Sequence, residues 1–130
     1  MIDQKYRTYP FRECTAIAGS SMGGLMAFYG VIKYNQYISI AACLSPAFGL
    51  CKKRLERDLP QNLNPDTRIY MSLGTEEFKR PQRFIKNIQE FNDYIVSQGA
   101  TSYINIIPGG HHNEAEWEKQ NELYMNVMWK

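Results

Sequence analysis

Three groups of polar residues in this chain have the types that covalent catalysis requires. Residues 19–23 read Gly-Ser-Ser-Met-Gly and place Ser21 at the centre of a G-x-S-x-G pattern. Two glutamates follow at 76–77, and the chain's two histidines follow at 111–112. A serine hydroxyl becomes a good nucleophile when a histidine takes its proton, and a carboxylate holds that histidine in the useful tautomer. The residue types therefore favour nucleophilic catalysis by serine.

The segments around Ser21 predict a sharp turn that exposes its hydroxyl. Apolar residues at 15–18 predict a strand, and residues 25–29 begin a helical pattern. We expect the turn between them to strain the backbone at Ser21, with glycine required at Gly19 and Gly23 because a Cβ would collide with the neighbouring strand and helix. The helix N-terminus would favour negative charge at Ser21. The alternative is a Gly/Ser-rich loop without function.

Hydrophobic runs along the rest of the chain predict alternating strands and helices. We expect residues 1–13 to form a loop and residues 49–66 to form another, with one helical turn around Leu55. The predicted strands are 14–18, 38–44, 68–73 and 101–107, and the predicted helices are 22–34, 81–99 and 113–129. Such alternation predicts an α/β fold with a parallel sheet of about four strands and helices on its faces.

The polar groups fall where a parallel sheet would bring them together. The third predicted strand ends in Gly74-Thr75-Glu76-Glu77 and the fourth in Gly109-Gly110-His111-His112. Ligands of such sheets lie beyond the carboxyl ends of the strands, where Ser21 also belongs. Taken singly, the glutamates suit a solvated surface or a helix cap, and the histidines suit a surface or a weak metal site. Further ligands at metal-binding spacing are missing, so we expect no metal.

Composition narrows the class of protein. At 130 residues, of which 44% are hydrophobic, we expect one domain over residues 1–130. A net charge of +2 gives no electrostatic footprint for nucleic acid, and no apolar run has the length of a membrane span. The polar N-terminus does not read as a signal peptide. Three cysteines, with Cys14 and Cys43 in apolar stretches, favour reduced, buried thiols and a cytoplasmic location.

Several of these motifs together resemble the putative esterase (esterase D-like) branch of the α/β-hydrolase superfamily. That branch includes enterochelin, feruloyl and acetylxylan esterases, S-formylglutathione hydrolases and the antigen 85 acyltransferases. Its triad runs in the order serine, acid, histidine along the chain. The resemblance rests on Ile2-Asp3, Tyr6-Arg7-Thr8, Phe11-Arg12-Glu13, Gly19-Ser20-Ser21-Met22-Gly23-Gly24, Ser45-Pro46-Ala47-Phe48, Gly74-Thr75-Glu76-Glu77, Gly109-Gly110-His111-His112-Asn113-Glu114 and Trp117.

The resemblance implies a role for each candidate residue. Ser21 matches the nucleophile, the second glutamate, Glu77, matches the acid, and the second histidine, His112, matches the base. The N–H of Met22 matches one donor of the oxyanion hole. These roles imply a cofactor-free serine carboxylic-ester hydrolase that forms an acyl-enzyme on a small-molecule ester, with sugar and aryl esters as candidates. Release of the acyl group to a sugar hydroxyl instead of water would make it a transferase.

The length of the chain departs from that family. Members are about twice as long, and here only about 13 residues precede the strand before Ser21. We therefore expect the C-terminal half of an α/β-hydrolase fold, without the early loop that supplies the second oxyanion donor. Loss of one such donor lowers the rate by ~100- to 1,000-fold. We also expect an open sheet edge that forms a homo-oligomer or pairs with an N-terminal half. The alternative function is an impaired esterase remnant that acts as a binding or assembly module.

Overall fold

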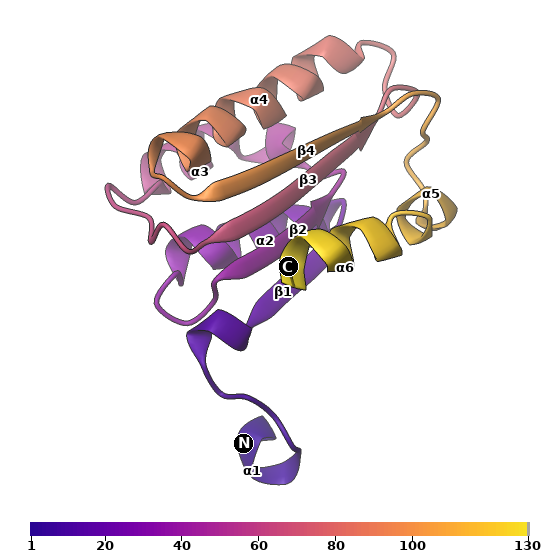
Figure 1. Ribbon diagram of the computed structural model, residues 1–130. Helices are drawn as coiled ribbons and strands as arrows, with labels where there is room; N and C mark the ends of the chain where they lie inside the picture. Colours follow the sequence, from indigo (N-terminus) through magenta and orange to yellow (C-terminus); the bar gives the residue numbers. More distant parts are fainter. Residues whose placement is uncertain (130) are drawn as a thin grey trace.

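A sheet of four parallel strands forms the centre of the molecule. The computed structural model describes residues 1–129, and Figure 1 shows the strands side by side in chain order, with β1 at one edge and β4 at the other. The strands are β1 (Ala16–Ser20), β2 (Ile40–Leu44), β3 (Arg68–Gly74) and β4 (Thr101–Ile107). All three pairings are parallel, so the carboxyl ends of the strands meet at one end of the sheet. The predicted four-stranded parallel sheet is confirmed.

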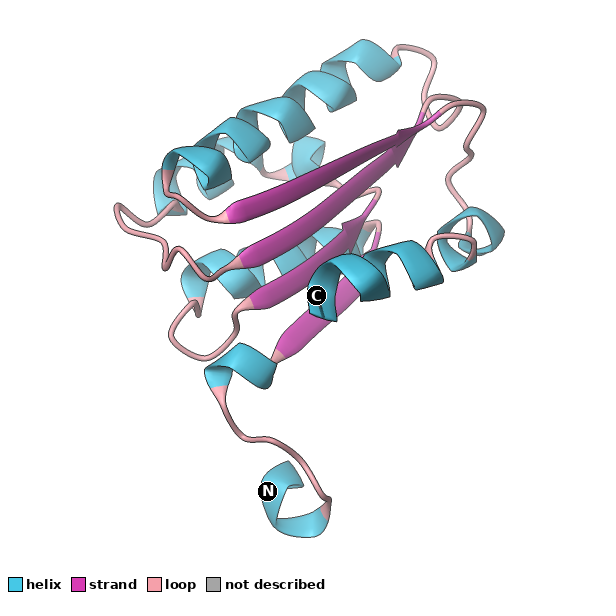
Figure 2. Cartoon of the chain, viewed as in Figure 1, coloured by secondary structure: helices cyan, strands magenta, loops and turns pink. Residues whose placement is uncertain are grey.

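Helices cover both faces of this sheet (Figure 2). Residues of α2, α3 and α4 pack in the larger core on one face, and residues of α5 and α6 pack on the other. The helical segments are α1 (Ile2–Lys5), η1 (Arg12–Cys14), α2 (Met22–Lys33), η2 (Phe48–Leu50), α3 (Lys52–Asp58), α4 (Pro81–Ser97), α5 (Glu114–Glu118) and α6 (Asn121–Trp129). The layers thus follow from the two central strands, β2 and β3, which are buried on both sides between helices.

The last helical region is divided, where the sequence predicts one helix over 113–129. The break falls at Lys119 and Gln120, between α5 and α6. The Gln120 side chain is buried, and its Oε1 accepts a hydrogen bond of 2.8 Å from the Tyr70 hydroxyl on β3. This contact with the sheet holds the chain where it changes direction. As a result, α5 carries Trp117 beside the carboxyl ends of the strands, while α6 packs along β2 and β3.

Two segments predicted as loops contain short helices. Residues 1–13 include the single turn of α1 and the first part of η1, and residues 49–66 contain α3, which is longer than the predicted single turn. The first strand also starts later than predicted, at Ala16. Cys14 therefore lies before the strand and is exposed, so the prediction that it is buried is wrong.

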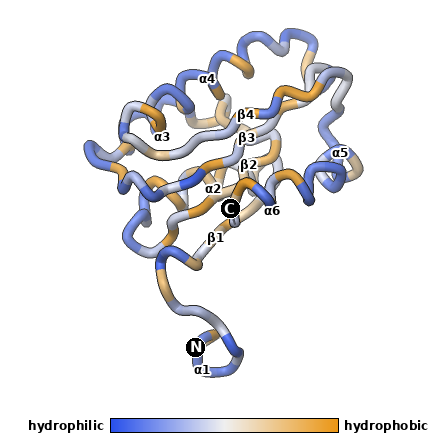
Figure 3. Tube along the Cα trace, in the orientation of Figure 1, coloured by the Kyte–Doolittle hydropathy of each residue, from blue (hydrophilic) through white to orange (hydrophobic). Residues whose placement is uncertain are grey.

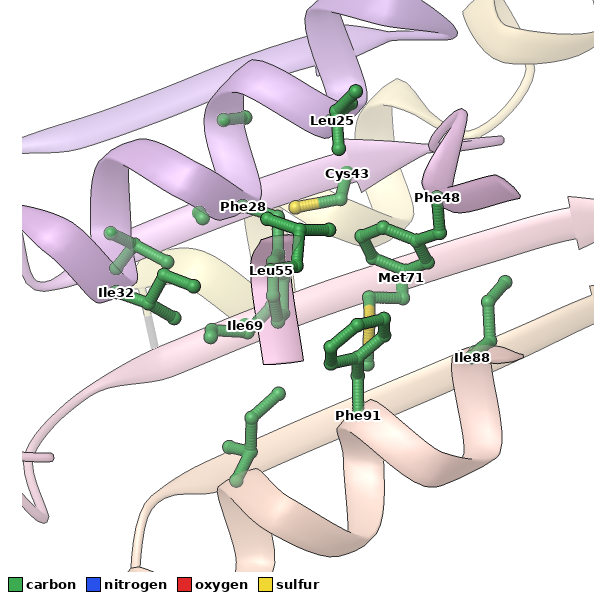
Figure 4. Close-up of a cluster of buried hydrophobic side chains, with 14 of the residues drawn as sticks. Leu25, Phe28, Ile32, Cys43, Phe48, Leu55, Ile69, Met71, Ile88 and Phe91 are labelled. Atoms are coloured by element: carbon green, nitrogen blue, oxygen red, sulfur yellow. The ribbon is translucent and has the colours of Figure 1, made fainter. Parts of the chain in front are cut away.

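Aromatic side chains fill the larger core. In Figure 4, Phe28 of α2, Phe48 of η2 and Phe91 of α4 point toward one another, with ring centroids 4.6–5.0 Å apart. Cys43 of β2 lies in the same core, and burial raises the pKa of its thiol. Figure 3 shows apolar residues along the strands and polar residues along the outside of α4. These contacts fix α2 and α4 against the sheet and so fix the loops that they adjoin.

Candidate active site

Ser21 occupies the turn between β1 and α2 in a strained conformation. Its φ and ψ are 55° and −116°, outside the regions that residues with a side chain usually adopt. The Ser21 N–H donates to the Leu44 carbonyl (2.8 Å), and the Ser21 carbonyl accepts from the Ala47 N–H (3.1 Å). The last residue of β2 and the segment after it therefore hold this backbone on both sides. The expected strand, sharp turn and helix are present, with Ser21 as the N-cap of α2.

Close backbone contacts explain two glycines of the turn. A Cβ on Gly19 would lie 2.4 Å from the carbonyl group of Gly23, which no side chain tolerates. The prediction for Gly23 itself is wrong, because a Cβ there would meet nothing within 4 Å. The constraint falls on the next residue instead, since a Cβ on Gly24 would lie 2.9 Å from the Leu44 carbonyl oxygen. The start of α2 can thus lie directly against the ends of β1 and β2.

Glu77 follows β3 and is held by two donors. Its Oε1 accepts hydrogen bonds from the Gly74 N–H and from the Ser45 hydroxyl, both 2.6 Å long, and its side chain is only 1% exposed. Glu76, in contrast, is exposed. The loop that carries Glu77 passes so close to the next loop that a Cβ on Gly74 would lie 2.2 Å from the carbonyl oxygen of Gly110.

His112 follows β4 and joins the serine to the glutamate. Its Nδ1 lies 2.7 Å from Glu77 Oε2, and its Nε2 lies 2.9 Å from Ser21 Oγ. The His112 side chain is 33% exposed, while Glu77 is closed off from solvent. The structure thus brings together Ser21, Glu77 and His112 at the carboxyl end of the sheet. The neighbouring His111 is exposed and makes no side-chain hydrogen bond with residues 1–129.

Two side chains that touch this group were quoted only as parts of motifs in the sequence. The Ser45 hydroxyl bonds to Glu77, and the indole N–H of Trp117 donates to Ser45 Oγ (2.9 Å). The Trp117 ring also packs edge-on against the ring of His112, with centroids 5.0 Å apart. The signals for both were present, since Ser45 comes directly after a buried strand and Trp117 ends the histidine motif.

A pocket of about 410 Å³ opens beside Ser21 and His112. Leu50, Phe78 and Phe84 give it apolar walls, with the rings of Phe78 and Phe84 stacked 3.8 Å apart. Arg83 adds a cation at this pocket. The first N–H of α2, that of Met22, makes no hydrogen bond with residues 1–129, so it is free to donate to a bound group.

Comparisons with known proteins identify the family and the fold of the chain. A model of the family described as "Putative esterase" matches residues 1–121. The chain belongs to this family. A search among curated proteins found no match for this esterase-family chain.

Several solved structures share its fold at low sequence identity. The S-formylglutathione hydrolase FrmB from Staphylococcus aureus superimposes with a TM-score of 0.67 at 18% identity, over 97% of this chain and 55% of its own. The enterochelin esterase from Shigella flexneri gives 0.79 at 16%, over 98% and 34%. SOBER1 from Arabidopsis thaliana gives 0.62 at 24%, over 98% and 59%. The predicted α/β-hydrolase architecture is confirmed, and the chain spans only part of the length of each neighbour.

Two further properties concern metals and membranes. Within residues 1–129, no group of three or more His, Cys, Asp and Glu side chains is arranged to hold a metal ion. No helix within the same residues combines the length and the apolar character needed to cross a membrane.

Proposed function

We propose that this chain is a serine carboxylic-ester hydrolase with Ser21 as nucleophile, His112 as base and Glu77 as the acid that orients His112. The observation that carries the proposal is the line of two hydrogen bonds from Ser21 Oγ through the His112 ring to Glu77. Membership of the esterase family supports hydrolase activity.

The first step acylates Ser21. His112 Nε2 takes the hydroxyl proton while Ser21 Oγ attacks the ester carbonyl carbon, and Glu77 stabilises the imidazolium that forms. The carbonyl oxygen becomes negatively charged and accepts a hydrogen bond from the Met22 N–H at the start of α2. The intermediate then collapses, the bond to the alcohol oxygen breaks, and His112 gives its proton to the departing alcohol.

The second step frees the enzyme. A water molecule gives a proton to His112 and attacks the acyl carbon on Ser21. Collapse breaks the bond to Ser21 Oγ, which recovers the proton from His112, and the carboxylic acid leaves. A sugar hydroxyl in place of water would make the same step an acyl transfer.

The pocket favours an aryl ester over a sugar ester. Its walls of Leu50, Phe78 and Phe84 offer apolar surface to a flat ring, whereas a sugar needs several hydrogen-bonding side chains. We therefore propose an aryl or other apolar group on the substrate, beside the ester bond that Ser21 attacks.

Labelling with a fluorophosphonate probe tests the proposal. We expect the wild-type protein to gain one phosphonyl group by intact mass and the Ser21→Ala variant to gain none. The matched control is Ser20→Ala, which removes the neighbouring hydroxyl and should leave labelling intact. A folded wild-type protein that is not labelled, or equal labelling of Ser21→Ala, would contradict the proposal.

The alternative function, an impaired esterase that acts as an assembly module, has support from the edge of the sheet. β1 is an edge strand with Ala18 exposed, and the aromatic side chains of Tyr6, Tyr9 and Phe11 lie exposed in the segment before it. An unpaired strand edge is a template for pairing with another chain. We propose that two copies of this chain pair through β1.

Light scattering of the purified chain at micromolar concentration tests this pairing. We expect a dimer for the wild type and a monomer for Ala18→Lys, because a charge at the edge disfavours strand addition. A monomeric wild type at that concentration would contradict pairing between copies.

A further inference from the structure

Ser45 stands out among the residues outside the proposed triad because its backbone is strained. It directly follows β2, has φ 46°, and is only 3% exposed. This conformation is unfavourable for a residue with a side chain, and it persists where the surrounding structure demands it. Its N–H donates to the Ser72 carbonyl on β3 (2.9 Å), which ties the strained residue to the neighbouring strand.

The neighbours of Ser45 leave Glu77 as the acceptor for its hydroxyl proton. The indole N–H of Trp117 can only donate, and it donates to Ser45 Oγ at 2.9 Å. The Ser45 hydroxyl then donates to Glu77 Oε1 at 2.6 Å, alongside the Gly74 N–H. With Oε1 occupied by two donors, Oε2 is left for His112 Nδ1. The carboxylate is thereby fixed in the rotation that serves His112.

The same short segment also holds the serine. Leu44 accepts from the Ser21 N–H and Ala47 donates to the Ser21 carbonyl, so the residues on either side of Ser45 fix the backbone of the nucleophile. Trp117, only 9% exposed, packs against His112 while it bonds to Ser45. Residues 44–47 therefore contact Ser21 and Glu77 directly and contact His112 through Trp117.

We propose that Ser45 is a positioning residue, which acts with Trp117 to fix the Glu77 carboxylate against His112; the proposal rests on the function proposed above. Ser45 lies at the edge of the pocket beside Ser21, but its hydroxyl is bonded to Glu77 and Trp117, so it acts on the reaction through them. Its loss would leave the buried Trp117 N–H without an acceptor and the Glu77 carboxylate with one donor fewer, so that the carboxylate could rotate away from His112.

The Ser45→Ala variant tests the proposal, with Ser72→Ala as its matched control. Both changes remove one buried serine hydroxyl, and the Ser72 hydroxyl has no hydrogen-bond partner within residues 1–129. We expect Ser45→Ala to lower kcat on an aryl acetate and the rate of fluorophosphonate labelling by about 10- to 100-fold, with KM within about two-fold. Ser72→Ala should leave all three within about two-fold.

Proton NMR supplies a readout that a purely structural role would not move. A histidine Nδ1 proton bonded to a carboxylate gives a separate low-field signal, which we expect in the wild type and in His111→Gln. The signal should shift or broaden in Ser45→Ala and in Trp117→Phe, which removes the indole N–H and keeps an aromatic ring. The Ser45→Ala/Trp117→Phe double variant should be no slower than Ser45→Ala alone, because both changes break one path.

The outcomes separate this inference from the proposed function. Unchanged kcat and an unchanged low-field signal in Ser45→Ala would overturn the positioning role, as would an equal loss in Ser72→Ala. A wild type that is never labelled overturns the hydrolase. In that event, loss of the low-field signal in Ser45→Ala but not in Ser72→Ala would still support the positioning of Glu77 and His112.

Discussion

Two polar clusters lie at opposite ends of the same sheet. They differ more in the conformation of their backbone than in the extent of their hydrogen bonding. We call them the carboxyl-end cluster and the amino-end cluster after the strand ends they adjoin. The carboxyl-end cluster consists of Ser21, Ser45, Glu77, His112 and Trp117, and the amino-end cluster consists of Arg12, Asn35, Asp66 and Thr67.

The amino-end cluster joins segments that are distant in sequence. The Arg12 guanidinium donates to both oxygens of Asp66 (2.5 and 2.7 Å), to Thr67 Oγ1 (3.2 Å) and to the Asn35 carbonyl. The Asn35 amide donates in turn to Thr67 Oγ1 at 2.9 Å. The segments that lead into β1, β2 and β3 are thus tied together through ordinary backbone conformations.

Within residues 1–129, only the carboxyl-end cluster combines a strained backbone with a histidine at a pocket; Arg12 and Asn35 of the amino-end cluster also line a pocket, of about 610 Å³, but with neither feature. In the same part of the chain, the non-glycine residues with positive φ are Ser21 and Ser45, and both belong to the carboxyl-end cluster. This cluster also leaves His112 partly exposed beside its pocket, with a serine at one nitrogen and a carboxylate at the other. A dense hydrogen-bond network therefore does not mark a reactive site by itself. Strained backbone and an accessible base beside a pocket distinguish the two ends.

The largest expected effect is on the carboxyl-end cluster. We expect Glu77→Gln to lower kcat by about 10⁴-fold, because an amide stabilises the wrong tautomer of His112 and cannot stabilise the imidazolium. Steady-state kinetics on an aryl acetate measures this, with the exposed Glu76→Gln as control. A decrease in kcat of less than about ten-fold would contradict the proposed role of Glu77.

The amino-end cluster should respond in stability and not in chemistry. We expect Arg12→Met to lower the free energy of unfolding by about 2 kcal/mol, because it removes charge-assisted hydrogen bonds from partners that are partly buried. Urea denaturation measures this, with the exposed Arg7→Met as control. The rate of fluorophosphonate labelling of the folded variant should stay within about two-fold. A ten-fold drop in that rate would mean that the two ends are coupled.

A smaller effect is expected next to His112. Asn113 caps α5, with its side chain accepting from the Glu116 N–H at 3.0 Å. We expect Asn113→Ala to lower the free energy of unfolding by about 1 kcal/mol, whereas Asn113→Asp, which keeps an acceptor, should cost less. Thermal unfolding compares the two. Equal loss in both variants would show that the cap contributes nothing.

Local patterns in the sequence predicted most of the fold and the candidate site. Apolar runs ended by glycine or proline gave the four strands, and the motifs at their ends pointed to Ser21, Glu77 and His112. The choice of Glu77 over Glu76, and of His112 over His111, came from the resemblance to the family. These features depend on neighbours in sequence, which a single chain displays.

The rest depended on contacts between distant residues. The division of α5 from α6 accompanies the contact between Tyr70 and Gln120, 50 residues apart, and Arg12 meets partners 23 to 55 residues away. The sequence predicted that glycine is required at Gly23, whereas the structure requires it at Gly24. The requirement depends on where α2 crosses the end of β2. No periodicity in the sequence reports such crossings.

The distance in sequence between the serine and its base has a consequence for folding. Ser21 and His112 are 91 residues apart, with three strand pairings between them. Contacts that close long loops form late, because their entropy cost must be met before the contact stabilises the chain. The reactivity of Ser21 toward a fluorophosphonate therefore reports when the last stage of folding is complete. During refolding from urea, we expect helical circular dichroism to recover first and labelling of Ser21 to recover last.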